Sequence, residues 1–256
     1  MSLRLLGVCT VCRAVVKNGA MAEDHDPDPD LDHDLDLTHW PRRATFEFYR
    51  GFDQPFFSVC TRVDVAALKP ALAQVEFGSI TLACHFLALQ LANRFEPWRY
   101  RLTQGRVRVM ATVHASTTVL LRDESFGFAY LRHATDYARF AAPAAQALAA
   151  ARTAKPAFEP RVGDAALLHF TTLPWLHFTS FAHARHRGTS DDKDSIPKIA
   201  FGRIDSDPAG GAQRWLPLSV DVHHALMDGV HVGRFVQAFE TAMHNPLPWL
   251  QGAAVP

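Results

Sequence analysis

Hydrophobic and polar residues alternate at several places along the chain, the pattern of half-buried β-strands. The run LPLSVDVHH at 216–224 is the clearest case, and FFSVCTRVDV at 56–65 alternates more loosely. YRLTQGRVRVMATV predicts a hairpin that turns at Gln104-Gly105, and TTVLL at 117–121 is expected to continue the same sheet. Further strands are predicted at about 166–172, 175–181, 198–204 and 215–223.

Helical spacing predicts the remaining elements. The segment 80–95 is apolar around most of its circumference, which indicates a buried helix that ends before Pro97. From 230 to 244 the apolar positions form a single stripe, typical of a helix with one buried side. A short helix is predicted at 41–50, and one or two alanine-rich helices at 129–154. Because strands and helices mix without a regular βαβ repeat, the pattern favours an α+β fold, a two-layer sandwich of a mixed sheet packed with helices.

The N-terminal part of the chain has a different composition. AEDHDPDPDLDHDLDL at 22–37 is acidic, contains two prolines and lacks an apolar face. Such a segment buries too little surface to offset the entropy lost on ordering, so we predict disorder for 1–36 and a single domain for 37–256. Cys9 and Cys12 form one C-x-x-C pair with no second pair at zinc spacing, which favours a chance occurrence over a metal or redox site.

Overall charge and hydropathy narrow the class of function. With 26 basic and 26 acidic residues, the chain has no electrostatic footprint for nucleic acid or for an anionic membrane. No apolar run approaches the roughly 20 residues that cross a bilayer. Arg13 interrupts the short apolar run near the N-terminus, so the sequence predicts a soluble, cytoplasmic protein.

Two adjacent histidines end the clearest strand. The strand period places one of them on each face: Leu216, Leu218, Val220, Val222 and His224 share the apolar face, and Pro217, Ser219, Asp221 and His223 share the polar one. A poorly solvated imidazole favours the neutral form, which is the form a general base needs. Asp228 either orients the His224 ring or forms a structural ion pair, and a plain core histidine with a loop aspartate is the alternative.

Three separated motifs resemble those of the chloramphenicol acetyltransferase family. LPLSVDVHHALMDGVHVGRF resembles its signature, a strand followed by HHAxxDGxHxxRF. HWPRRATFEFYR resembles its first helix, and LPWLHFTSF resembles its PWxxFxSF strand. The motifs occur in the family's order between about Thr38 and Gln251, so the resemblance implies the fold shared by CoA-dependent acyltransferases.

The resemblance also implies an activity. Members of the family are homotrimers that move acetyl from acetyl-CoA to a hydroxyl, without a metal, at active sites between two subunits. On that pattern His224 is the general base for direct attack of the alcohol, and no acyl-enzyme forms. Ser180 matches the serine that stabilises the oxyanion. Chloramphenicol is one candidate acceptor among small-molecule alcohols.

Other residues match supporting positions of the family. Asp228 and Arg42 correspond to an ion pair that holds the catalytic loop. Tyr49, Phe57 and Phe128 fall where the family lines its acceptor pocket with aromatic side chains, although each also suits a plain core.

The chain departs from the family in three places. Ala200 stands where the family usually has the threonine of a P-x-x-T segment, and AHARHRG at 182–188 replaces an asparagine-containing run. The acidic N-terminal extension has no counterpart. These differences concern the acceptor pocket more than the acyl-transfer chemistry.

Two other classes of function are alternatives to an O-acetyltransferase. The catalytic core of a dihydrolipoyl acyltransferase shares a strand–DHRxxDG–helix pattern, but it uses a thiol acceptor and carries a lipoyl domain, which this sequence lacks. A non-enzyme is the second alternative: either a trimeric binding protein on the same scaffold, or a metal binder that uses His223, His224, Asp228 and His231.

Overall fold

A mixed β-sheet forms the centre of the computed structural model, which describes residues 32–154, 158–161, 163–185 and 194–252. Its strands lie in the order β2-β10-β8-β7-β5-β6, and β9 pairs with β10 outside this path. β5, β7 and β8 are parallel, whereas the other pairings are antiparallel. The strands are β2 (Phe56–Asp64), β5 (His114–Leu120), β6 (Phe126–Leu131), β7 (Leu167–Thr172), β8 (Lys198–Phe201), β9 (Asp205–Ser206) and β10 (Arg214–His223).

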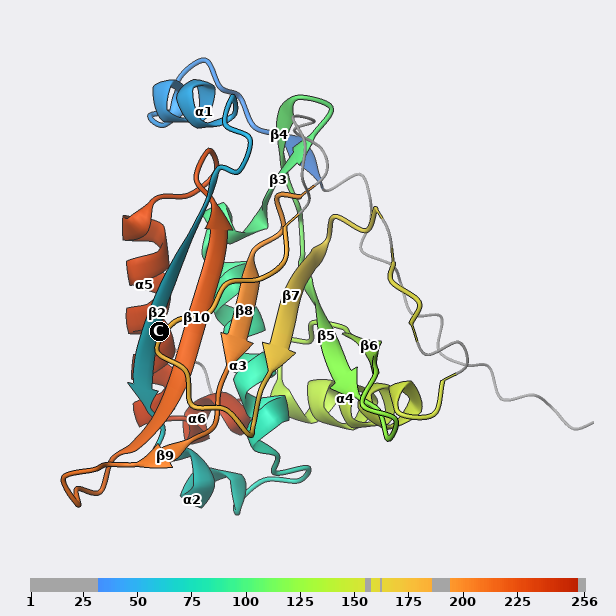
Figure 1. Cartoon of the computed structure of the whole chain (residues 1–256), viewed down its shortest axis with the longest axis vertical. Helices are drawn as coiled ribbons and strands as arrows, with labels where there is room; N and C mark the ends of the chain where they lie inside the picture. Colours follow the sequence, from blue (N-terminus) through green and yellow to red (C-terminus); the bar gives the residue numbers. More distant parts are fainter. Residues whose placement is uncertain (1–31, 155–157, 162, 186–193, 253–256) are drawn as a thin grey trace, which may run out of the picture.

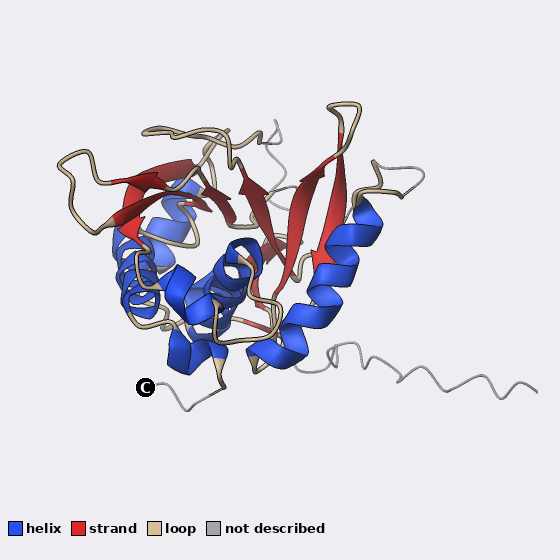
Figure 2. Ribbon diagram, turned by 90° about the horizontal axis from the view of Figure 1, so that it is seen from below, coloured by secondary structure: helices blue, strands red, loops and turns tan. Residues whose placement is uncertain are grey.

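Helices cover one face of this sheet, and loops cover the other (Figure 2). The two-layer α+β architecture predicted from the sequence is therefore confirmed. α1 lies apart from the helical layer, at the end of the sheet where β10 finishes (Figure 1). The helices are α1 (Arg43–Tyr49), α2 (Leu68–Leu72), α3 (Ile80–Arg94), the 3₁₀ helix η2 (Glu96–Arg99), α4 (Tyr137–Ala151), α5 (Gly229–His244) and α6 (Leu247–Leu250).

The main core lies between the helices and the sheet. Every residue of α3 from Leu82 to Ala92 is buried, as its nearly uniform hydrophobicity predicts. The apolar stripe of α5 packs into the same core, with the Phe235 ring stacked on Trp98 at 3.9 Å between centroids. The apolar face of β10 completes this core through Leu216, Leu218, Val220 and Val222.

A second, smaller core supports the end of the sheet near α1. It joins α1, the loop after β10 and the hairpin of β3 (Tyr100–Thr103) and β4 (Arg106–Val109). Its buried members are Phe46, Tyr100, Leu102, Val107, Val109, Ala225 and Leu226. This core supports the loop after β10, because Ala225 and Leu226 of that loop are buried in it.

The hairpin turns where the sequence predicts, but it belongs to a different sheet. Gln104 and Gly105 both have positive φ, +50° and +72°, as a two-residue hairpin turn of the favoured hand requires. The prediction that 117–121 continues this sheet is wrong. β4 pairs with β1 (His33–Asp34) in a separate three-stranded sheet, and the chain turns away after Val109 to start β5 in the main sheet.

The predicted disorder through residue 36 is wrong for residues 32–36. β1 pairs with β4, and the Leu35 N–H donates to the Val107 carbonyl at 2.8 Å. The acidic side chains meet basic ones of β4, as in the pair of Asp34 with Arg106 at 2.5 Å. Composition alone does not show these contacts, which together with the packing of Leu35 and Leu37 offset the entropy of ordering. The rest of the tract, together with Cys9 and Cys12, lies outside the described residues.

Two further predictions are wrong in part. The start of the segment 129–154 belongs to β6, because FGFAYL alternates along β5, and helix begins only at Tyr137. The predicted strand at 175–181 is irregular chain. Both of its faces are apolar, so alternation did not define a sheet partner. It crosses the loop-covered face of β10 without joining the ladder (Figure 1).

Within the part of the chain that the structure describes, none of the helices has both the length and the apolar character to span a bilayer.

His85 links α3 to β5 from inside the core. Its Nδ1 lies 2.7 Å from the Thr81 carbonyl and its Nε2 lies 3.1 Å from the Thr117 hydroxyl. Burial lowers the pKa of His85 from 6.5 to about 4. Burial is also the main cause that lowers the pKa of His133, His169 and His183 to about 4.

We therefore predict that the free energy of unfolding falls as the pH drops from about 6.5 toward 4. In that range the unfolded chain takes up protons that the folded chain excludes, and each such proton contributes up to about 1.4 kcal/mol per pH unit. Urea unfolding at pH 7, 6 and 5 measures this slope. His85→Gln should make the slope shallower and the exposed His244→Gln should not; equal stability at pH 7 and 5 would contradict the prediction.

Candidate active site

The loop between β10 and α5, residues 224–228, is a tight turn held by its own backbone. The N–H groups of Leu226 and Met227 both donate to the His223 carbonyl at 3.0 Å. The His224 N–H donates to the Pro55 carbonyl at 2.6 Å, just before β2. Backbone hydrogen bonds thus tie the loop to the end of β10 and to the residue that precedes β2.

The His224 ring lies between two aromatic side chains. It stacks on Tyr49 of α1, with 3.9 Å between centroids and 9° between planes, and it tilts against Phe57 of β2 at 4.7 Å. Its side chain is 29% exposed, but Nδ1 is buried and lies 3.3 Å from Oδ1 of Asp228 in a geometry that makes no hydrogen bond. The ring is therefore held in place while its remaining edge stays accessible.

Arg42 holds this loop from the start of α1. Its guanidinium makes a bidentate pair with Asp228, through Nε at 2.6 Å and Nη2 at 2.7 Å. It also donates to the backbone carbonyls of His224 and Ala225, each at 2.9 Å. These hydrogen bonds to Arg42 are the main cause that lowers the pKa of Asp228. The predicted ion pair of Arg42 with Asp228 is therefore present in the structure. The same guanidinium also binds the backbone of the loop.

A further histidine fixes the start of α5. Nδ1 of His231 accepts the backbone N–H of Asp228 at 2.8 Å, which caps the first turn of the helix. His223, by contrast, lies on the opposite face of β10, with its ring edge against Phe56 at 5.2 Å. The strand period therefore assigned the two adjacent histidines to the correct faces. No structural role for His231 was predicted from the sequence, although its position three residues after Asp228 is a helix-capping signal.

Ser180 does not lie with His224 in the single chain. It is exposed, in the irregular segment that crosses the loop-covered face of the sheet, which is called the open face below. Among the described residues, no hydrogen bond joins it to His224. The next residue is anchored: the Phe181 carbonyl accepts the Ser219 hydroxyl at 3.2 Å and the Cys60 thiol at 3.8 Å. The position of Ser180 is therefore set by the strands β10 and β2 beneath it.

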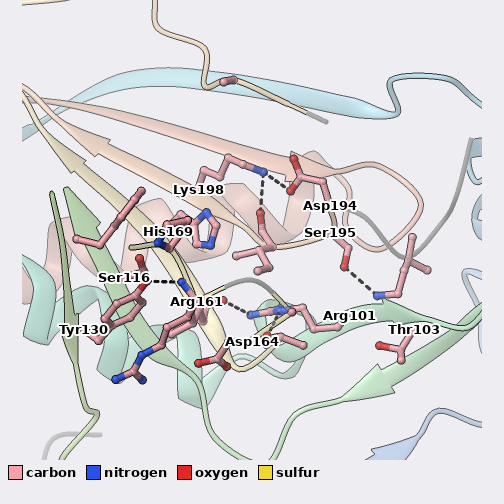
Figure 3. Close-up of a pocket in the computed structure, with 18 of the residues that line it drawn as sticks. Arg101, Thr103, Ser116, Tyr130, Arg161, Asp164, His169, Asp194, Ser195 and Lys198 are labelled. Atoms are coloured by element: carbon pink, nitrogen blue, oxygen red, sulfur yellow. Dashed lines mark hydrogen bonds and ion pairs between the residues drawn. The ribbon is translucent and has the colours of Figure 1, made fainter. Parts of the chain in front are cut away.

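Phe128 lines a cavity of about 800 Å³ on the open face of the sheet (Figure 3). The walls come from the β3–β4 hairpin, β5, β6, β7, β8 and residues 158–161, 163–165 and 194–196. Phe128, Tyr130 and Phe158 supply aromatic surface there. Tyr49, Phe57 and His224 do not line this cavity, so the single chain separates the predicted site residues into two groups.

A buried ion pair lies in the wall of the cavity (Figure 3). The Lys198 ammonium donates to Asp194 at 2.5 Å and to the Ile196 carbonyl at 3.3 Å. Burial lowers the pKa of Lys198, and Asp194 acts in the opposite direction. Beside it, His169 has its pKa lowered to about 4, mainly by burial and further by Lys198. These residues were not predicted from the sequence, although a lysine in the apolar run PKIAF is a usable signal.

Ala200 lies on the same face of β8 as Lys198. It is fully buried and pairs with Ser219 of β10, beneath the segment that carries Ser180. The position where the family usually has threonine is therefore part of the open face, and here it offers no hydroxyl.

Among the residues that the structure describes, no group of three or more histidine, cysteine, aspartate or glutamate side chains is arranged to hold a metal ion. Asp228 and His231 use their polar atoms on Arg42 and on the loop backbone.

Comparison with known proteins places the chain among acetyltransferases. The family model described as "Chloramphenicol acetyltransferase" matches residues 32–240. A chloramphenicol acetyltransferase of Streptomyces acrimycini is 30% identical over 222 residues, which cover 84% of this chain and 96% of that protein. Chloramphenicol acetyltransferase 3 of Escherichia coli is 27% identical over 215 residues, covering 83% of this chain and 97% of that protein.

Solved structures agree on the fold. A chloramphenicol acetyltransferase superposes with a TM-score of 0.68 at 21% identity, covering 83% of this chain and 99% of that one. The cubic core of the pyruvate dehydrogenase multienzyme complex superposes with a TM-score of 0.59 at 17% identity, covering 81% of this chain and 88% of that one. The fold is therefore that of CoA-dependent acyltransferases, which the sequence motifs predicted.

The contacts of Arg42 predict its effect on stability. Arg42→Ala removes the partner of a partly buried carboxylate and of two backbone carbonyls, so we expect the free energy of unfolding to fall by about 2–3 kcal/mol. Arg43→Ala is the matched control, because the pair of Arg43 with Glu47 is 56% exposed on both sides and should change stability by less than about 0.5 kcal/mol. Urea denaturation of both variants tests this, and equal stability of the two would show that Arg42 does not hold the loop.

Proposed function

The chain belongs to the chloramphenicol acetyltransferase family and is an acyltransferase, and on that premise we propose that it acetylates a hydroxyl of a small-molecule alcohol with acetyl-CoA as donor and His224 as general base. The observation that carries the proposal is the His224 ring itself. It is stacked on Tyr49, its loop is held by Arg42, and one edge remains accessible. The cytoplasmic location predicted from the sequence fits a co-substrate of this kind.

In the proposed reaction His224 takes the proton of the acceptor hydroxyl. The alcohol oxygen attacks the thioester carbonyl and forms a tetrahedral intermediate. The C–S bond then breaks, and the proton held by the imidazole passes to the leaving thiolate, giving the acetyl ester and CoA. A positioned base of this kind contributes about 10²–10⁴ in rate. Because the buried Nδ1 faces Asp228, the accessible edge of the ring is the part that meets the acceptor.

The other predicted residues have supporting roles in this proposal. The Ser180 hydroxyl donates a hydrogen bond to the oxyanion, a contribution of about 10²–10³ in turnover. Arg42 and Asp228 keep the loop in place and carry no proton, since both are engaged in one bidentate pair.

We further propose that the active site forms between two copies of the chain in a homotrimer. This accounts for the separation of His224 and Tyr49 from the cavity that contains Phe128, because the base of one subunit would complete the pocket of its neighbour. It also accounts for the exposure of Ser180 in the single chain. The cavity would then be the acceptor pocket, and about 800 Å³ is within the usual range for small-molecule sites.

The relatives are named for chloramphenicol, which makes this drug the first acceptor to test. The buried Lys198–Asp194 pair in the cavity wall favours an acceptor with polar groups. Dihydrolipoamide belongs in the same panel, because the thiol-acceptor alternative shares the fold.

The acceptor panel is the direct test. We expect acetyl-CoA to release free thiol in the presence of chloramphenicol or another hydroxylated substrate, and dihydrolipoamide to be a poor acceptor. His224→Ala should lower kcat by at least about 10²-fold with little change in Tm, because the ring supplies chemistry. The exposed His244→Ala is the matched control and should retain activity. No thiol release with any alcohol, or an active His224→Ala enzyme, would refute the proposal.

Mixed trimers test the shared site. Co-expression of His224→Ala with Ser180→Ala should restore activity, because a site between an intact base from one subunit and an intact serine from its neighbour can form. Random mixing of equal amounts leaves about a quarter of such sites intact. Activity of the mixture no higher than that of the two separate variants would show that both residues act from one chain.

A further inference from the structure

A buried ion pair lies beneath the segment that carries Ser180. Asp221, on the open face of β10, is fully buried, and Nη2 of Arg185 donates to its Oδ1 at 2.7 Å. The same nitrogen donates to the Ser58 hydroxyl of β2 at 2.9 Å, and the guanidinium lies over the Phe56 ring at 5.1 Å. Arg185 therefore contacts both β10, which ends beside the candidate catalytic loop, and β2, which begins there.

Side chains of the sheet hold the rest of this segment. The second oxygen of Asp221 accepts the His183 N–H at 3.2 Å. Two residues earlier, the Phe181 carbonyl accepts the Ser219 hydroxyl and the Cys60 thiol. Within the described residues, no backbone-to-backbone hydrogen bond ties 177–185 to the sheet. The segment is therefore anchored by these side-chain contacts together with the burial of Phe178.

The ion pair of Arg185 with Asp221 is the strongest of these side-chain contacts, because both partners are charged. A carboxylate in a dry interior needs a partner, since an unpaired buried charge is strongly unfavourable. Lys198, the register partner of Asp221 on β8, is engaged by Asp194. The His183 ring lies 3.9 Å from Asp221, and its pKa, lowered to about 4 mainly by burial, keeps it neutral near pH 7. Among the described residues, Arg185 is thus the cation hydrogen-bonded to Asp221.

We propose that Arg185 is a positioning residue, whose ion pair with Asp221 holds the segment 178–185 against β10 and β2 and so sets the place of the Ser180 hydroxyl. The catalytic part of this inference rests on the proposed role of Ser180. The anchoring part rests on the contacts alone and can be tested without any activity.

Cys60 provides the test of anchoring, because the segment lies over its thiol. In Arg185→Met we expect alkylation of Cys60, followed by peptide mass mapping, to be about tenfold faster than in the unaltered protein. Cys84 is an internal standard, since it is buried in α3 and reacts only when the core opens. Arg203→Met is the matched control, because Arg203 forms an exposed pair with Asp205 and should leave Cys60 protected. An unchanged Cys60 rate, or equal acceleration of Cys60 and Cys84, would overturn the anchoring role.

A kinetic cycle tests the link to Ser180. Arg185→Met alone should lower kcat about 10- to 100-fold, with the KM for acetyl-CoA changed less than about threefold. In a Ser180→Ala background the same substitution should lower kcat less than about twofold, because the hydroxyl it positions is already absent. Losses that multiply in full would show that Arg185 acts elsewhere. A Ser180→Ala enzyme with normal kcat would instead overturn the proposed role of Ser180, while the alkylation result still decides the anchoring.

Discussion

The guanidinium of Arg42 is the contact on which the geometry around His224 depends. Its planar fork of donors binds both oxygens of Asp228 and two successive backbone carbonyls of the loop. A turn between a strand and a helix leaves such carbonyls without ladder or helix partners, so an external donor is needed to hold it. The same short helix, α1, supplies Tyr49, which stacks on His224. One element therefore both holds the loop and limits the rotation of the ring.

The two faces of β10 are stabilised by different kinds of interaction. One face packs its apolar residues against α5, and hydrophobic burial is sufficient to define it. The other face carries a serine, an aspartate and a histidine, all of them buried. Polar groups in such a position need defined partners. Residues 181–185 supply them for Ser219 and Asp221, and the Ala225 N–H donates to Nδ1 of His223. Polar contacts on this face thus add directional anchoring to a segment that is otherwise held by the burial of Phe178.

Backbone pairing, apolar packing and charge complementarity together order residues 32–36, which composition assigns to disorder. Asp32 and Asp34 meet the arginines of β4, and the Asp32 carboxylate accepts the Ala111 N–H at 2.6 Å. Leu35 and Leu37 then pack on the small core that supports the loop after β10. The first described residues therefore pack on the same small core as the candidate catalytic loop.

The sequence by itself determined those features that depend on contacts close in the chain or on a simple period. These include the buried helix α3, the stripe of α5, the hairpin turn at Gln104 and the opposite faces of His223 and His224. The motifs also identified the pairing of Arg42 with Asp228, which are far apart in the chain. Local patterns are sufficient here because helix and strand periods directly set which side chains point to the core.

Apart from the pair of Arg42 with Asp228, only the tertiary structure decided which distant segments meet. Alternation along 175–181 and in the hairpin did not reveal the sheet partners, because a period of two specifies a face and not a neighbour. The Arg185–Asp221 pair depends on how residues 173–185 cross the sheet after β7, which no local pattern encodes. The same reason explains why the sequence could assign Ser180 and Phe128 to one site, whereas the folded chain places them away from His224. Their distance is set by the packing of whole elements around the sheet.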